Sequence, residues 1–165
     1  MGLITGVVLT ILLMVVGAYI YFAQGFAPVA TSSRPMPFEE TLARIGLRAA
    51  LNKQPLKTAP IEASETNLLA GAMVYQENCA VCHGMPGGSK TAIAKGMFPP
   101  PPQLFHGNGV TDDPPGETYW KVANGIRLTG MPGFAKTLSE AEIEDLARYM
   151  SSQKGPKVPA QPARK

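Results

Sequence analysis

Apolar residues are spread unevenly along this chain, and their spacing changes in character from one end to the other. Residues 2–23 are apolar, glycine, threonine or tyrosine throughout, with no ionisable side chain. A helix of this length is long enough to cross the hydrocarbon core of a bilayer. We therefore predict a transmembrane anchor at residues 1–23, in contact with membrane lipid through residues 2–23.

The alternative for this segment is a cleaved secretory signal. Such a signal normally carries Lys or Arg before a shorter apolar stretch, and no basic residue precedes Leu3. The length and the missing basic residues favour a retained anchor.

Residues 24–64 predict a linker that contains one short helix. The stretch 24–36 is rich in Pro, Ser and Thr, whereas apolar residues recur at helical spacing between Pro37 and Leu51. The acidic residues of that helix come first and the basic ones later, which complements a helix dipole. The apolar stripe fits packing on the chain's own domain, and it fits equally well a strap that lies on a partner subunit or the membrane surface. Its members are Phe38, Leu42, Ile45 and Ala49.

Residues 65–153 predict a small all-α domain. One helix runs through Leu68–Tyr75 toward Cys79, with Gly71 inside it, and a second covers residues 119–125. No segment shows sustained strand alternation, and Pro and Gly dominate residues 85–115. A polypeptide core of about 90 residues is marginal by itself, so a buried cofactor would supply much of the missing apolar contact.

The last helix of this domain has the clearest start in the chain. Ser139 and Glu142 form a capping box, and Leu138 with Ile143 forms the matching hydrophobic staple. The apolar face that follows is expected at Ile143, Leu146, Ala147 and Met150.

Charge and composition add little to this organisation. The chain has 165 residues and a formal net charge of +3, which allows one modest domain plus accessory segments. Residues 154–165 are basic and Pro-rich and predict a disordered tail. Nothing in the sequence indicates a nucleic-acid partner.

The chemistry of the chain is concentrated in Cys79-Ala80-Val81-Cys82-His83. This C-x-x-C-H spacing is the signature of covalent c-type haem attachment, in which the thiols bond the porphyrin and the adjacent imidazole ligates the iron. One haem c, bound through Cys79 and Cys82 with His83 as an iron ligand, is the predicted cofactor.

Zinc, a redox pair or a disulfide could also account for two cysteines, but each lacks a requirement in this sequence. Structural zinc needs four ligands, and His106 is the only other histidine. A thioredoxin-like pair lies between a strand and a helix, whereas the residues before Cys79 predict a helix. A disulfide across so short a loop would remove very little conformational entropy from the unfolded chain.

Residues 66–153 resemble a class I monohaem cytochrome c, with a helix leading into Cys79–Gly84, a Pro-rich loop, a short helix, a Met-Pro-Gly turn and a final helix. The resemblance implies that the sixth iron ligand is Met131, in Gly130-Met131-Pro132-Gly133-Phe134. His/Met ligation raises the reduction potential relative to harder axial pairs. His106 is the rival ligand and would lower it.

The resemblance also implies supporting positions around the haem. A proline carbonyl should accept a hydrogen bond from the His83 imidazole, and we expect it in the run 99–102, with Pro99 and Pro100 as the chosen candidates. Trp120 either donates to a haem propionate or packs on the porphyrin. Arg127 either neutralises a propionate or is an ordinary solvated charge.

These features predict a membrane-anchored one-electron carrier, or the cytochrome c subunit of a respiratory complex, rather than an enzyme in its own right. Redox partners would be a quinol-oxidising complex, a terminal oxidase, a dehydrogenase or a soluble cytochrome. Since c-type cytochromes mature outside the bacterial cytoplasm, the haem domain should face the periplasm from the inner membrane, although the basic residues after the anchor weakly favour the opposite orientation.

The alternative function is a haem enzyme or gas sensor with a labile sixth ligand, and a purely structural haem subunit is a third possibility. For a carrier, the expected docking cations for an acidic partner are Lys90, Lys95, Lys121, Arg127 and Lys136.

Overall fold

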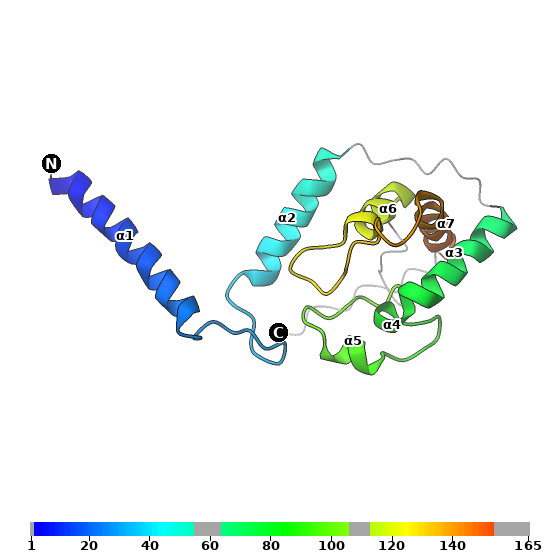
Figure 1. Ribbon diagram of the computed structural model, residues 1–165, viewed down its shortest axis with the longest axis horizontal. Helices are drawn as coiled ribbons and strands as arrows, with labels where there is room; N and C mark the ends of the chain where they lie inside the picture. The colour runs from blue at the N-terminus through cyan, green and yellow to red at the C-terminus, as the bar shows by residue number, and fades with distance from the viewer. Residues whose placement is uncertain (1, 55–63, 106–112, 154–165) are drawn as a thin grey trace, which may run out of the picture. The chain divides into compact units, whose positions relative to one another are not determined.

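The computed structural model of the protein describes residues 2–54, 64–105 and 113–153. It divides into two units, Met1–Glu39 and Glu40–Lys165. The first contains helix α1, and the second contains helices α2 to α7 (Figure 1). All regular structure in the described ranges is helical, so the predicted all-α fold is confirmed.

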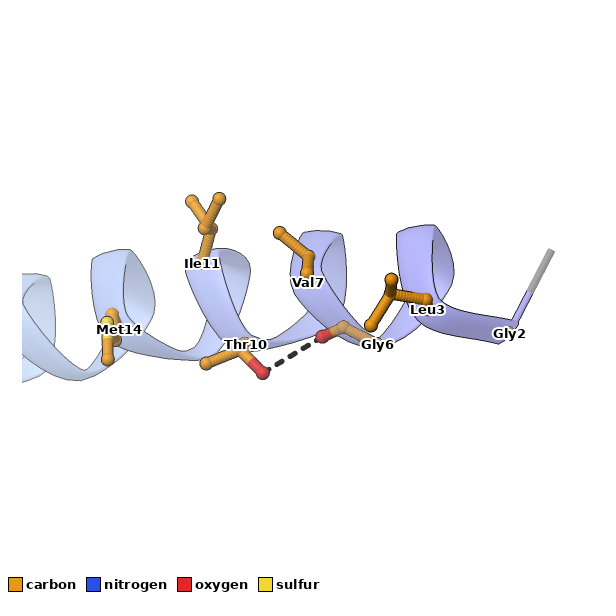
Figure 2. A pocket seen from close by; sticks show the side chains of 7 residues that line it. All are labelled: Gly2, Leu3, Gly6, Val7, Thr10, Ile11 and Met14. Carbon is orange, nitrogen blue, oxygen red and sulfur yellow. Dashed lines mark hydrogen bonds between the residues drawn. The ribbon is translucent and has the colours of Figure 1, made fainter.

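Helix α1 spans Gly2–Ala23 and has no buried residue. Its length and composition are those of a membrane-spanning helix. A signal sequence near the N-terminus meets the same two criteria. The Thr10 hydroxyl of α1 donates to the Gly6 carbonyl at 2.9 Å (Figure 2). That bond satisfies a polar group within the helix, which suits an apolar environment.

Helix α2 spans Glu39–Lys53, so it begins two residues later than expected. Phe38 has a φ of 66°, a left-handed conformation that cannot continue a right-handed helix. The Glu39 carboxylate accepts from the Met36 backbone N–H at 2.9 Å and closes the turn that precedes the helix. The second unit begins at Glu40 and therefore includes most of α2.

Two helices, α3 and α7, form the frame of the second unit, and they pack on each other more extensively than any other pair. Helix α3 spans Glu65–Asn78, and the Ser64 side chain caps it by accepting from the Asn67 N–H. Helix α7 spans Glu140–Ser152, and the predicted capping box of Ser139 and Glu142 is confirmed. So is its apolar face, because Ile143, Leu146, Ala147 and Met150 are all buried.

The connecting helices are short. Helix α4 spans Ala80–His83, α5 spans Ala92–Gly96 and α6 spans Pro115–Asn124. Helix α5 was not expected within the Pro- and Gly-rich stretch, and it forms because the Thr91 side chain caps it. Helix α6 begins four residues before the predicted Tyr119, because Pro115 is tolerated at the first helical position.

The crossing of α3 and α7 depends on Gly71. A Cβ atom there would collide with the Asp145 carbonyl oxygen and would lie 2.8 Å from the Tyr149 Cβ. The two residues of α7 nearest to Gly71 are Asp145 and Tyr149. Only a residue without a side chain permits this backbone approach.

We expect Gly71→Ala to lower the free energy of unfolding of the haem-loaded protein by about 1–3 kcal/mol, because overpacking must separate α3 from α7. Gly46→Ala, in α2 with nothing within 4 Å of the added Cβ, is the matched control. It should be neutral or stabilising by up to about 1 kcal/mol. Denaturant unfolding followed by far-UV circular dichroism measures both, and equal effects would contradict a role for close packing at Gly71.

Candidate haem-binding site

The two cysteines lie on one turn of helix. Cys79 joins α3 to α4, and its carbonyl oxygen accepts from the N–H groups of Cys82 at 3.1 Å and His83 at 2.9 Å. Cys79, Cys82 and His83 are all half-buried. The segment is therefore a compact helical turn that presents two thiols and one imidazole within five residues.

Three side chains from outside this turn bind its free carbonyl groups. Tyr75 donates to Gly84 at 2.6 Å, Thr91 donates to Val81 at 2.6 Å, and Gln103 donates to Cys82 at 3.4 Å. The last carbonyls of a helix have no partner within it. Here α3, the loop before α5 and the Pro-rich loop supply those partners and hold the turn in place.

The imidazole of His83 has a defined orientation. Its Nδ1 lies 2.8 Å from the carbonyl oxygen of Pro102. A carbonyl oxygen only accepts, so Nδ1 carries the proton and donates, and Nε2 keeps a lone pair for a metal. Burial lowers the pKa of His83 and the hydrogen bond to Pro102 opposes that effect, with a net lowering that favours the neutral, ligating form.

The proline that supports His83 is thus Pro102, and not Pro99 or Pro100, the two candidates chosen from the sequence. The direction of each carbonyl in the run is set by the path of the loop backbone. Four consecutive prolines in the sequence do not indicate that path. Pro99 is half-buried and Pro100 is exposed.

The surroundings of Cys79 differ from those of a catalytic redox cysteine. Burial, with a smaller contribution from Cys82, raises the pKa of the Cys79 thiol to about 11. A catalytic redox pair needs a lowered thiol pKa instead. Within the described ranges, no three His, Cys, Asp or Glu side chains gather as a metal site would require.

The loop that carries Met131 is docked on the end of α6 through its backbone. Phe134 N–H donates to Val122 at 2.9 Å, and Ala135 N–H donates to Ala123 at 3.1 Å. Within the loop, the Met131 N–H donates to the Thr129 hydroxyl at 3.1 Å. Met131 is half-buried and packs against the hydrophobic core.

A second methionine reaches the same loop. A Cβ on Gly130 would collide with the terminal methyl group of Met97, so the Met97 side chain lies directly against the residue before Met131. The contact with Gly130 makes Met97 the thioether that any test of Met131 must include.

The remaining predicted site residues are placed as follows. Trp120 is half-buried on α6, and Arg127 is exposed in the loop after that helix. Their roles toward a haem propionate stay predictions. His106 and the tail at residues 154–165 lie outside the described residues.

Lys121 differs from its expected role as an exposed docking cation. Its Nζ lies 2.6 Å from Asp113 Oδ2 and 2.6 Å from Glu117 Oε1, and its side chain is 13% exposed. Burial acts to lower the pKa of Lys121, but the hydrogen bonds and charges of both carboxylates outweigh it, and the net pKa is raised. This ion pair belongs to the packing of α6.

Sequence reasoning missed Tyr75, Thr91 and Gln103 as site residues. Tyr75 is 1% exposed, and its ring contacts Phe105 and Tyr149 with centroids 5.0 Å and 6.1 Å away. The apolar ring at helical spacing signals a core position, which is correct. The hydroxyl partner, nine residues along the chain, leaves no signal in the sequence.

These residues fit a covalently bound haem. The thiols share one turn, the imidazole presents a lone pair, and the thioethers of Met131 and Met97 lie on or against one docked loop. Residues 66–150 match the family model described as cytochrome c oxidase, cbb3-type, subunit III. The chain belongs to this family of class I c-type cytochromes. Membership implies a covalently bound haem c.

Curated relatives cover the same region. Cytochrome c6 of Limnospira maxima is 34% identical over 87 residues, which are 53% of this chain and 93% of that protein. The CcoP subunit of the cbb3-type oxidase of Azospirillum brasilense is 33% identical, covering 66% of this chain and 33% of the relative. The cytochrome c subunit of the quinone alcohol dehydrogenase of Gluconobacter oxydans is 36% identical, covering 54% and 19%.

A solved structure agrees with this fold. A chain of the reducing HAO-like protein complex of Kuenenia stuttgartiensis aligns with a TM-score of 0.50 and 30% identity, over 57% of this chain and 46% of that one. The matched region spans 93% of the Limnospira cytochrome c6, but only 33% of the CcoP subunit and 19% of the alcohol dehydrogenase subunit. The relatives of this c-type cytochrome identify it as an electron-transfer protein.

We expect Tyr75→Phe to lower the free energy of unfolding of the haem-loaded cytochrome by about 1–3 kcal/mol, because the buried Gly84 carbonyl loses its donor while the ring still packs. Tyr149→Phe, in the same aromatic cluster but half-buried, is the control and should cost less. Denaturant titration gives both values. Equal free energies of unfolding for the two variants would show that the hydrogen bond from Tyr75 to Gly84 does not stabilise the domain.

Lys121→Gln should destabilise the cytochrome by about 1–3 kcal/mol near neutral pH, because two carboxylates lose their shared cation. A raised folded-state pKa means that this stabilisation is complete below the ordinary lysine value of 10.5 and is lost as the pH rises through the folded value. The gap between wild type and variant should therefore shrink in alkaline buffer. Lys136→Gln, at an exposed lysine, is the control. A difference between wild type and Lys121→Gln that does not change with pH would contradict a stabilising role for the Lys121 charge.

Proposed function

We propose that this cytochrome is a one-electron carrier with His83 and Met131 as the axial ligands of a single haem c. The observation that carries the proposal is the 2.8 Å contact between His83 Nδ1 and the Pro102 carbonyl, which assigns the proton to Nδ1 and leaves Nε2 as the ligating atom. A bound haem c supplies an Fe(III)/Fe(II) couple. The chain's task is to hold and shield it.

Several residues perform that task. Pro102 fixes the tautomer and raises the basicity of His83. Tyr75 and Thr91 hold the turn that carries the cysteines, and the buried side chains of Val74, Leu104 and Val122 exclude water from the core beside it. Rigid support of this kind suits electron transfer, because little of the protein needs to rearrange.

Met131 is favoured over Met97 as the sixth ligand. Its loop is fixed to α6 by backbone hydrogen bonds at Phe134 and Ala135, so the position of the Met131 backbone is well defined. A thioether from Met131 together with the His83 imidazole would favour the reduced iron and would leave no open position for a substrate. Both consequences suit a carrier.

We extend the proposal to location and partners. Helix α1 anchors the cytochrome in the bacterial inner membrane, and the haem domain faces the periplasm. The length and apolar composition of α1 support the anchor, and relatives named as subunits of an oxidase and a quinone dehydrogenase support a membrane redox complex as partner. Detergent extraction with co-purification distinguishes a free carrier from a fixed subunit.

Met131→Ala should lower the reduction potential by on the order of 100 mV or more and should let the reduced protein bind carbon monoxide rapidly, because the sixth position opens. Potentiometric titration and optical spectra measure both effects. The wild-type protein should bind carbon monoxide slowly or not at all.

Met97→Ala is the decisive comparison, and Met73→Ala, at a residue 62% exposed, is the control. Both should keep the wild-type spectrum and potential. Loss of the sixth ligand in Met97→Ala with an unchanged Met131→Ala would transfer the role to Met97. Rapid carbon monoxide binding by the wild type would contradict the carrier function itself.

A further inference from the structure

Helix α2 has apolar residues on two opposite faces. On one face Leu51 is buried, and Ala43, Leu47 and Ala50 are half-buried. On the other face lie Leu42, Ile45 and Ala49, spaced by one and two helical turns, which we term the outer stripe. Leu42 is 65% exposed and Ile45 is 59% exposed. The described structure leaves this second face uncovered.

Exposure of large aliphatic side chains in register on one helix face is unusual for a helix that only caps its own domain. The residue directly before α2 adds to it, because Phe38 is 75% exposed and is held with a φ of 66°. The turn around Phe38 is closed by the contact between the Met36 N–H and the Glu39 carboxylate, and it leaves the aromatic ring exposed at the start of α2.

The charges around the outer stripe indicate what covers it. By helical rotation Arg48 lies on one flank of the stripe and Lys53 on the other. Both acidic residues of α2 are in its first turn, and Glu40 pairs with Arg44 at 3.5 Å. The sequence from residue 41 to residue 61 contains no carboxylate and has the cations Arg44, Arg48, Lys53 and Lys57.

An apolar stripe with basic flanks is the pattern of a helix that lies in the headgroup region of an anionic bilayer. Chain connectivity points to the same surface. Fifteen residues separate Ala23, the end of α1, from Glu39, the start of α2. Fully extended, they reach about 50 Å, so α2 stays within reach of the membrane surface where α1 would emerge.

We propose that the outer stripe of α2 lies in the headgroup region of the bilayer that α1 spans, with Arg48 and Lys53 on the phosphates of anionic phospholipids. This inference rests on the proposed anchoring by α1. The helix then acts as an interfacial strap, with its opposite face on its own domain. It holds that domain in one orientation to the membrane, which a flexible linker alone would not do.

The test uses the full-length, haem-loaded cytochrome in nanodiscs of phosphatidylcholine, with or without phosphatidylglycerol. A phospholipid with a photoactivatable diazirine near its headgroup is included, and crosslinked residues are mapped by mass spectrometry. We expect crosslinks at Leu42 and Ile45 at least about fivefold above those at Leu69, a leucine of α3 with a similar exposure of 60%. Phosphatidylglycerol should increase the yield.

A paired variant tests the charges without touching the stripe. Arg48→Glu with Lys53→Glu should lower the α2 crosslinks at least about threefold in phosphatidylglycerol discs, while crosslinks on α1 stay unchanged. An unchanged haem spectrum shows that the domain is intact. Equal yields for this variant and the wild type would overturn the role of anionic lipid.

The crosslinks also separate this inference from the anchoring proposal. Crosslinks on α1 without crosslinks on α2 overturn the interfacial strap and leave the anchor in place. Absence of crosslinks on both helices overturns the anchor as well. Protection of Leu42 and Ile45 from lipid in native membrane vesicles, with crosslinks only to a protein, would identify a partner subunit as the occupant and overturn the lipid surface.

Discussion

The hydrogen bond between His83 Nδ1 and the Pro102 carbonyl is the constraint around which the haem domain is arranged. It joins the cysteine turn to the far end of the Pro-rich loop, nineteen residues along the chain. It also determines which imidazole nitrogen remains available as a ligand. The Gln103 side chain, one residue beyond Pro102, makes a parallel contact with the Cys82 carbonyl, so the loop binds the turn at two points.

The other side of the turn is held by the packed helices. Tyr75 projects from α3 and binds the Gly84 carbonyl, and its ring lies among Phe105 and Tyr149. Tyr149 belongs to α7, whose close approach to α3 requires Gly71. The position of the turn that carries His83 therefore depends on the crossing of α3 and α7, through the buried Tyr75 side chain.

Much of this arrangement was predictable because its signals are local in sequence. The cysteine spacing, the capping box at Ser139 and the apolar face of α7 each lie within a few residues, and physical rules about helices read them directly. The resemblance to class I cytochromes c implied a ligand role for Met131, which spacing alone does not, and that role stays a prediction. The fold class followed from the absence of strand alternation.

The features that could not be predicted depend on directions in space. Four adjacent prolines look alike in sequence, and only the backbone path shows that Pro102 faces His83. In the sequence Lys121 looks like an exposed lysine available for docking. The turn before α6 brings Asp113 beside it, so the two side chains form an ion pair. Met97 reaches Gly130 across the fold, and no local pattern records that contact.

The docking of the Met131 loop on α6 constrains the number of residues in that loop. At its two ends Gly125 and Gly133 meet backbone to backbone, with the Gly133 nitrogen 2.5 Å from where a Gly125 Cβ would stand. No side chain at that junction can adjust to absorb an error. Between these ends Leu128 is 69% exposed but has a φ of 62°, so its backbone conformation restricts the residue although little packs on its side chain. An insertion or deletion between the two glycines would displace Met131 by a whole residue.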